Sequence, residues 1–177
     1  MGDRFGFNDL SFTGTNCKRA TRLSACGYLG HRTRACRCTP DQIARYQGRI
    51  SGPLLDRIDL QIEVPALAES ELVGAPAGEA SAPIRERVAV ARERQLARQS
   101  KPNGELEVRE IDSVCRVDAA AQTALRIAIA RLAWSARSYH RVLKVARTVA
   151  DLAGEPGIGI AHVMEAIQYR RALSRSE

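Results

Sequence analysis

The stretch Leu132–Leu152, LAWSARSYHRVLKVARTVADL, predicts a long amphipathic helix. Ser135 precedes the helical pattern as an N-cap, because a serine hydroxyl can accept a hydrogen bond from a free N–H of the first turn. The residues Gly154-Glu155-Pro156-Gly157 end the pattern, since glycine and proline favour a turn over another turn of helix. We therefore expect a helix over residues 136–153 with one apolar side facing a core.

Basic side chains on this helix are candidates for binding an anion. Arg137 lies in the first turn, where free N–H groups and the helix dipole favour negative charge, which makes it a candidate for contact with an anion. Arg141, Lys144 and Arg147 follow at spacings of three or four residues and form a basic stripe. The stripe has two readings: contact with nucleotide or DNA phosphates, or a solvated face that pairs with acidic residues such as Asp151. For Lys144 and Arg147 we favour the solvated face.

The neighbouring sequence predicts a mainly α fold. Apolar residues at helical spacing indicate further helices over residues 82–99, 107–115, 119–132 and 159–173. We expect Ser81 to cap the first of these and Asp118 to cap the third. Helices joined by such short turns make a compact C-terminal bundle.

A second stretch, Gly48–Pro65, GRISGPLLDRIDLQIEVP, changes period. Thr39-Pro40-Asp41 can start a short helix, with Thr39 as its N-cap, and Gly48 stops this helix. Apolar residues then alternate with polar ones from Ile58 to Val64, which predicts a half-buried strand. Arg57 lies at this helix-to-strand corner, where its planar donors suit a phosphate. The alternative is an arginine paired with its own neighbours Asp56 and Asp59.

The composition of the chain limits the kinds of partner that it is expected to bind. Lys plus Arg outnumber Asp plus Glu by 27 to 20 over 177 residues, a net charge of +7, so an anionic partner is plausible. No apolar run approaches the roughly 18 residues that span a bilayer, and no apolar core of a secretory signal follows Met1. We expect a cytoplasmic protein with no membrane partner.

The cysteines favour metal over disulfides. The chain has five cysteines, an odd number grouped mainly between Cys17 and Cys38, which in a reducing compartment suggests metal first. Cys26, Cys36 and Cys38 offer three ligands for a zinc ion, and Cys17 or His31 could complete the site. The alternative is three free thiols.

Both long stretches resemble the magnesium-chelatase-like AAA+ ATPases of the ComM/YifB type. The resemblance runs from Cys26 to about Leu173. It implies a remnant of an α/β ATPase core over residues 26–65, a linker over 66–81 and a lid-like helical C-terminal domain over 82–174. Residues 1–25 lie outside the resemblance, so we expect a poorly ordered N-terminus and a truncated or misread gene.

The resemblance also implies roles for single residues. Arg57 matches the arginine finger that reaches the nucleotide of a neighbouring subunit, and Arg137 matches the sensor-2 arginine. The full-length family uses ATP and Mg²⁺, forms hexamers and, in competence-associated members, drives branch migration of DNA. A four-cysteine family pattern coincides with Cys26, Cys36 and Cys38, while Ser24 stands at its first position.

The sequence contains neither a G-x-x-x-x-G-K-[ST] loop nor a Walker B strand, so we do not expect this chain alone to hydrolyse ATP. The alternatives are a stand-alone basic helical module that binds DNA, and a subunit that donates Arg57 or Arg137 to a separate ATPase.

Overall fold

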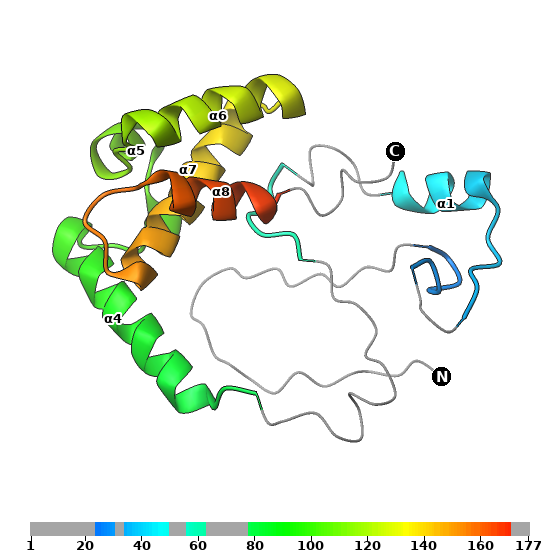
Figure 1. Cartoon of the computed structure of the whole chain (residues 1–177), viewed down its shortest axis with the longest axis horizontal. Helices are drawn as coiled ribbons and strands as arrows, with labels where there is room; N and C mark the ends of the chain where they lie inside the picture. Colours follow the sequence, from blue (N-terminus) through cyan, green and yellow to red (C-terminus); the bar gives the residue numbers. More distant parts are fainter. Residues whose placement is uncertain (1–23, 31–33, 50–55, 63–77, 171–177) are drawn as a thin grey trace. The chain divides into compact units, whose positions relative to one another are not determined.

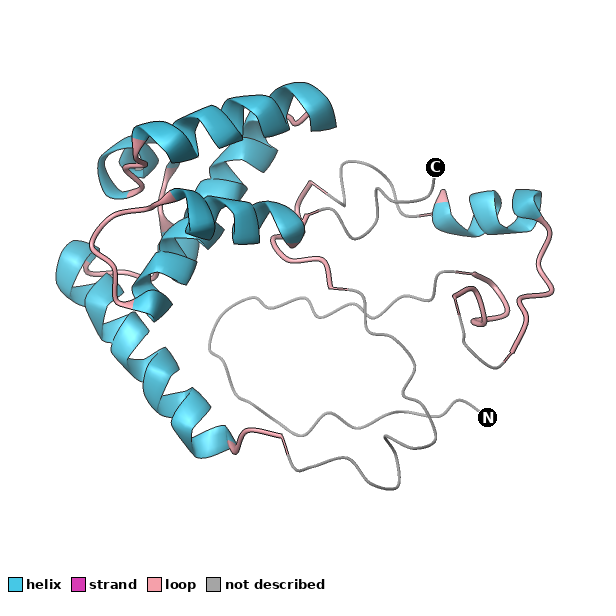
Figure 2. Ribbon diagram, viewed as in Figure 1, coloured by secondary structure: helices cyan, strands magenta, loops and turns pink. Residues whose placement is uncertain are grey.

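The computed structural model describes residues 24–30, 34–49, 56–62 and 78–170. The chain divides into two compact units, residues 1–47 and 48–177, and each is described by itself. Every regular element in the described ranges is a helix (Figure 2). The mainly α fold expected from the sequence is therefore confirmed.

The first unit contains one described helix, α1 (Pro40–Gln47). Thr39 caps it as predicted: its Oγ1 accepts a hydrogen bond from the N–H of Gln42 at 3.3 Å. The Gln42 side chain accepts one in return from the N–H of Thr39 at 3.1 Å. This reciprocal pair satisfies donors that the start of a helix leaves free.

The second unit is the helical bundle seen at the left of Figure 1. Its elements are α4 (Ser81–Gln99), the 3₁₀ turn η1 (Asn103–Glu105), α5 (Val108–Val114), α6 (Ala119–Leu132), α7 (Ala136–Ala153) and α8 (Ile160–Gln168). The helix α7 contacts α4, α5, α8 and η1, so it is the central element. Among the described helices, none combines the length and the apolar character needed to span a bilayer.

The helix boundaries follow local chemistry. Asp118 accepts from the N–H of Ala121 at 2.6 Å and Ser135 from the N–H of Ser138 at 3.2 Å, so both predicted N-caps are confirmed. Gly154 ends α7 with φ of 83°, a left-handed conformation that glycine adopts without strain. The expected cap at Ser81 is wrong, because Ser81 is already helical and Ala80 precedes it.

Two further expectations need correction. The helix α8 ends at Gln168, and Leu173 lies outside the described residues. Residues 58–62 form no strand: Leu60 is 49% and Ile62 67% exposed, and no described segment pairs with them as a ladder. An alternating pattern makes a strand only where a neighbour supplies hydrogen bonds.

A core of buried apolar side chains fills the bundle. It contains Leu106, Ile111, Cys115, Ala121, Leu125, Ala128, Val142, Leu143, Ala146, Ala150, Ile158, Val163, Ala166 and Ile167. Four of these belong to α7. Small alanines among them let the helices approach closely.

A buried ionic network surrounds Asp151 near the end of α7. Arg98 of α4 donates to both carboxylate oxygens, at 2.7 and 2.9 Å. Asn103 of η1 donates to Oδ2 at 2.8 Å, and Arg147 donates through Nε to Oδ1 at 3.1 Å. Asp151 is 1% exposed and Arg147 2%, so this Asp151 network ties α4, η1 and α7 together inside the unit.

Arg147 is therefore neither on a solvated face nor available to phosphates, and both readings of it were wrong. Besides Asp151, its guanidinium donates to the backbone oxygens of Glu155 at 2.6 Å and Pro156 at 2.9 Å. The expected partner Asp151 was right, but the pair is buried. The helices α8 and α4 both contact α7, and the periodicity of α7 alone does not reveal these contacts.

We predict that Asp151→Asn lowers the free energy of unfolding at pH 7 by about 3 kcal/mol, because two arginines lose their buried counter-charge. Burial by itself raises the pKa of Asp151, but hydrogen bonds from Arg98 and Asn103 and the charge of Arg147 outweigh it, and the pKa lies below its usual range. The ionised carboxylate thus stabilises the fold above the unfolded pKa of about 3.9, and this stabilisation is lost as pH falls through the folded pKa.

Urea unfolding from pH 7 to pH 3 measures this prediction. The difference between wild type and Asp151→Asn should shrink towards the acid end. Asp112→Asn, at an exposed position of α5, is the matched control and should change stability by no more than about 0.5 kcal/mol. A loss that stays constant across the pH range would contradict the ionic origin.

Candidate functional site

Asp56 joins the segment that carries Arg57 to the start of α7. Its Oδ1 accepts from the Ser138 hydroxyl at 2.8 Å and its Oδ2 from the Ser135 hydroxyl at 3.1 Å. Arg170 lies 3.7 Å from Oδ1 and is 5% exposed. We call Asp56, Ser135, Ser138 and Arg170 the Asp56 cluster.

Arg170 secures the same segment a second time. It donates to the backbone oxygen of Ile58 at 3.0 Å and to the Ser138 hydroxyl at 3.0 Å. Close by, the N–H of Gln61 donates to the backbone oxygen of Tyr169 at 2.6 Å. Residues 56–62 are thus held against the first turn of α7 and the end of α8, although no ladder forms.

The electrostatics of Asp56 agree with this arrangement. Its pKa is lowered, first by the hydrogen bond from Ser138, then by Ser135 and by the charges of Arg170 and Arg137, against an opposing effect of burial. Asp56 is therefore an ionised partner shared by the end of α8 and the first turn of α7. The expectation that Asp56 pairs with Arg57 is wrong.

Arg57 and Arg137 are both exposed. Asp59, the other expected partner of Arg57, forms an ion pair with Arg141 instead. Neither Arg57 nor Arg137 makes a hydrogen bond or ion pair with another residue in the described part of the chain. Two exposed guanidinium groups with fixed charge therefore remain available to an outside anion, one on the segment 56–62 and one in the first turn of α7.

A cavity of about 640 Å³ opens beside this contact. Apolar side chains, among them Leu60, Ile62 and Val108, line it together with residues of α7 that include Arg137, His140, Arg141 and Lys144. Arg141 is engaged by Asp59, and the Lys144 ammonium donates to the backbone oxygen of Gly104 at 3.2 Å. The basic stripe expected from the sequence is thus not a free basic surface: Arg141 and Lys144 have internal partners, and Arg147 is buried.

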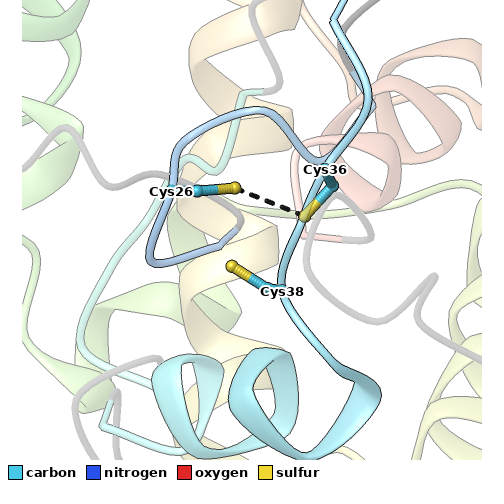
Figure 3. A group of neighbouring side chains, drawn as sticks. All are labelled: Cys26, Cys36 and Cys38. Atoms are coloured by element: carbon cyan, nitrogen blue, oxygen red, sulfur yellow. Dashed lines mark hydrogen bonds between the residues drawn. The ribbon is translucent and has the colours of Figure 1, made fainter.

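The first unit brings its three described cysteines together. The Sγ atoms of Cys26, Cys36 and Cys38 all lie within 4.8 Å of one another, and those of Cys26 and Cys36 are 3.4 Å apart (Figure 3). The Ser24 hydroxyl lowers the pKa of Cys26 to about 6, helped by backbone N–H groups of Tyr28 and Arg37. Three free thiols at this spacing fit a soft metal ion such as zinc. Cys17 and His31 lie outside the described residues.

Comparison with known proteins identifies the class to which this bundle and its preceding segment belong. The family model described as "Magnesium chelatase, subunit ChlI C-terminal" matches residues 78–170. The model described as "Magnesium chelatase, subunit ChlI" matches residues 13–72. This match begins thirteen residues before Cys26, the residue at which the resemblance was recognised from the sequence. The chain belongs to the magnesium chelatase family.

Among its relatives are the competence protein ComM of Haemophilus influenzae, 46% identical over 135 residues, and the protein YifB of Salmonella typhimurium, 44% identical over 135 residues. Each comparison covers 76% of this chain but only 26% and 27% of the relative. The uncharacterized protein Rv2897c of Mycobacterium tuberculosis is 37% identical over 145 residues, which is 79% of this chain and 28% of that protein. The chain spans about a quarter of the length of these relatives.

Sequence reasoning missed the Asp56 cluster. Ser135 was recognised as a cap, but Ser138 and Arg170 were not recognised at all. Asp56 meets Ser138 across 82 positions of the chain and Ile58 meets Arg170 across 112. The one local signal was two serines at an N-cap and three residues later, a spacing that places both hydroxyls at the same helix start.

We predict that Ser138→Ala releases residues 56–62 from the bundle. The change removes a donor to Asp56 and an acceptor for Arg170, interactions that involve charged groups and together contribute about 1.5 to 3 kcal/mol. The backbone N–H of Gln61 should therefore exchange with solvent at least about tenfold faster, as measured by amide hydrogen exchange. Ser113→Ala, which removes an exposed hydroxyl from α5, is the control. Unchanged exchange at Gln61 in Ser138→Ala would contradict the role of the Asp56 cluster in holding residues 56–62.

Proposed function

We propose that residues 56–170 form the helical C-terminal part of an ATP-driven, magnesium-chelatase-type AAA+ machine that acts on DNA. Arg57 serves as an arginine finger for nucleotide on a neighbouring subunit. Arg137 serves as the sensor-2 arginine that reads the nucleotide phosphates from the helical domain. The observation that carries the proposal is that both arginines are exposed and form no hydrogen bond or ion pair with the residues that the structure describes, while the Asp56 cluster joins their segments.

The chemistry of both side chains supports these roles. A phosphoryl group in transfer carries negative charge on its oxygens, and a guanidinium placed beside it stabilises that charge with planar, fixed donors. An arginine already paired within its own chain would first have to break that pair. Both aspartates that could pair with Arg57 bind other side chains: Asp56 binds Ser135 and Ser138, and Asp59 binds Arg141.

The Asp56 cluster gives this pair of arginines a common frame. It fixes the residue next to Arg57 to Ser138, which is the residue next to Arg137. A movement of the helical bundle, driven by nucleotide at Arg137, would therefore carry Arg57 with it. Such a link suits a ring in which each subunit contributes one arginine to its own nucleotide and one to its neighbour's.

ATP and Mg²⁺ are the cofactors that this proposal requires. In this chain Arg57 and Arg137 are the groups that fit nucleotide phosphates. The phosphate-binding loop that would hold the metal-bound nucleotide is not among these 177 residues. The test therefore joins residues 48–170 to the remainder of a relative, by replacing the matching residues of Haemophilus influenzae ComM.

We predict that Arg57→Ala in this chimera lowers ATP turnover on the order of a thousandfold, the range known for loss of an arginine finger. Arg137→Ala should also lower turnover and weaken nucleotide binding. Arg126→Ala, at an exposed position of α6, is the matched control and should leave turnover unchanged. Equal turnover for Arg57→Ala and the control would overturn the assignment.

Mixing subunits tests whether Arg57 acts in trans. A chimera with Arg57→Ala and a second chimera with its phosphate-loop lysine replaced are each inactive alone. Mixed, they rebuild complete sites only if the arginine comes from the neighbour, because one subunit then supplies the loop and the other the finger. Recovery of ATP turnover on mixing supports the proposal, and its absence with intact assembly contradicts it.

The alternative of a stand-alone DNA-binding module leads to a different expectation. Its best support is the set of exposed arginines on α4, such as Arg85 and Arg92. We predict that the chain alone binds duplex DNA no more tightly than about 1 μM at physiological salt, the non-specific range, because most of the basic stripe on α7 is engaged or buried. Fluorescence anisotropy at two salt concentrations measures this, and nanomolar affinity would favour the module.

A further inference from the structure

The three described cysteines of the first unit lie around a common centre. Cys26 belongs to the loop 24–30, while Cys36 and Cys38 belong to the segment that leads into α1 (Figure 3). Their sulfur atoms lie within 4.8 Å of one another. A disulfide would need about 2.05 Å between two sulfurs, and the 3.4 Å between Cys26 and Cys36 excludes one here.

These separations suit a single metal ion. Zinc binds thiolate sulfur at about 2.3 Å, and a tetrahedral angle then places two sulfur ligands about 3.8 Å apart. The 3.4 Å between Cys26 and Cys36 is close to that value, and every other pair of these sulfur atoms lies within 4.8 Å. Small changes of side-chain torsion would therefore bring three thiolates onto one ion.

Ser24 lies where a fourth ligand would stand. Its hydroxyl oxygen is 3.5 Å from the sulfur of Cys26 and 3.7 Å from that of Cys36. In a tetrahedral site with zinc–oxygen and zinc–sulfur distances of about 2.0 and 2.3 Å, an oxygen and a sulfur ligand lie about 3.5 Å apart. Ser24 is also fully buried at 0% exposure, which is unusual for a serine on a surface loop.

The loop backbone holds this arrangement in place. The N–H of Leu29 donates to the Ser24 hydroxyl at 3.3 Å, and the N–H of Gly27 donates to the Ser24 backbone oxygen at 3.0 Å. Gly27 and Gly30 have φ of 80° and 79°, values that other residues adopt only with strain. The loop thus turns tightly enough to direct Ser24 and Cys26 towards the same point.

We propose that Cys26, Cys36 and Cys38 bind one zinc-class divalent ion as thiolates, with the oxygen of Ser24 as a weak fourth ligand. The ion would join the loop 24–30 to the segment before α1 and so order the first unit. Because a neutral serine oxygen binds zinc far less strongly than a thiolate, this position remains exchangeable. The proposal is independent of the function proposed for Arg57 and Arg137.

Cobalt substitution tests the ligand set on the whole chain. Co²⁺ replaces Zn²⁺ in such sites, and its thiolate charge-transfer absorption grows with each sulfur bound. We predict one Co²⁺ per chain with tetrahedral d–d bands, displaced by Zn²⁺. Ser24→Cys should raise the charge-transfer absorption per ion by about one third, from three thiolates to four, and tighten Zn²⁺ binding at least about tenfold in chelator competition.

Single substitutions separate the possible ligands. Cys36→Ala should abolish tetrahedral Co²⁺ binding. Cys115→Ala is the matched control and should leave the spectrum unchanged, because Cys115 is buried in the other unit, and burial raises the pKa of its thiol to about 11. Cys17→Ala and His31→Ala should also leave it unchanged.

Three outcomes would overturn the proposal. Absence of stoichiometric Co²⁺ or Zn²⁺ binding by the reduced, folded chain would refute the metal site. Loss of absorption in Cys17→Ala or His31→Ala would refute Ser24 as the fourth ligand, and so would a Ser24→Cys spectrum identical to that of the wild type. Circular dichroism of each variant shows that the helices remain, so that a lost signal reports a lost ligand.

Discussion

The buried carboxylate of Asp151 is the interaction on which the helical bundle depends. It binds two arginines and an asparagine from three elements, and Arg147 continues the network to the backbone that follows α7. A buried charge without partners is strongly unfavourable, so each member requires the others to be in place. The network therefore specifies how α4 crosses α7 more narrowly than the alanine-rich core does, because small apolar side chains tolerate many packing arrangements.

The helix α7 also carries Arg137, to which we assign a function, in its first turn. At its C-terminal end α7 is fixed by the Asp151 network, and at its N-terminal end by the Asp56 cluster, with Val142 and Ala146 fully buried between them. Residues 56–62, which have no strand partner in the described structure, are attached to this part of the bundle through Ser138 and Arg170. The position of Arg57 thus depends on side-chain contacts to a helix that lies far from it in the sequence.

The sequence predicted what local chemistry controls. Thr39, Asp118, Ser135 and Gly154 marked helix ends correctly, because capping needs only residues within one turn. The sequence-based prediction was wrong where contacts with distant segments determine the local structure or the burial of a side chain. The alternation from Ile58 to Val64 indicated a strand, yet a strand needs a neighbour. The spacing of Arg147 indicated a solvated face, yet its side chain is buried against Asp151 and the backbone that follows α7. The three cysteines were recognised as a group from their spacing, whereas the buried position of Ser24 beside them needed the folded loop.

The charge at the start of α7 supports a role for Arg137 beyond stability. The first turn of α7 contains no acidic residue, and a cation there faces the positive end of the helix dipole, at a cost of about 0.3 to 1 kcal/mol. Asp56 offsets part of this repulsion from outside the helix, but its oxygens are already bound to Ser135 and Ser138. Arg147 lies near the C-terminal end of the same helix, where the helix dipole favours a cation, and its guanidinium has hydrogen-bond partners in Asp151, Glu155 and Pro156. A phosphate bound at Arg137 would add negative charge where α7 itself carries no acidic residue, so the dipole of α7 and the charge of Arg137 would both favour nucleotide at this end of the helix.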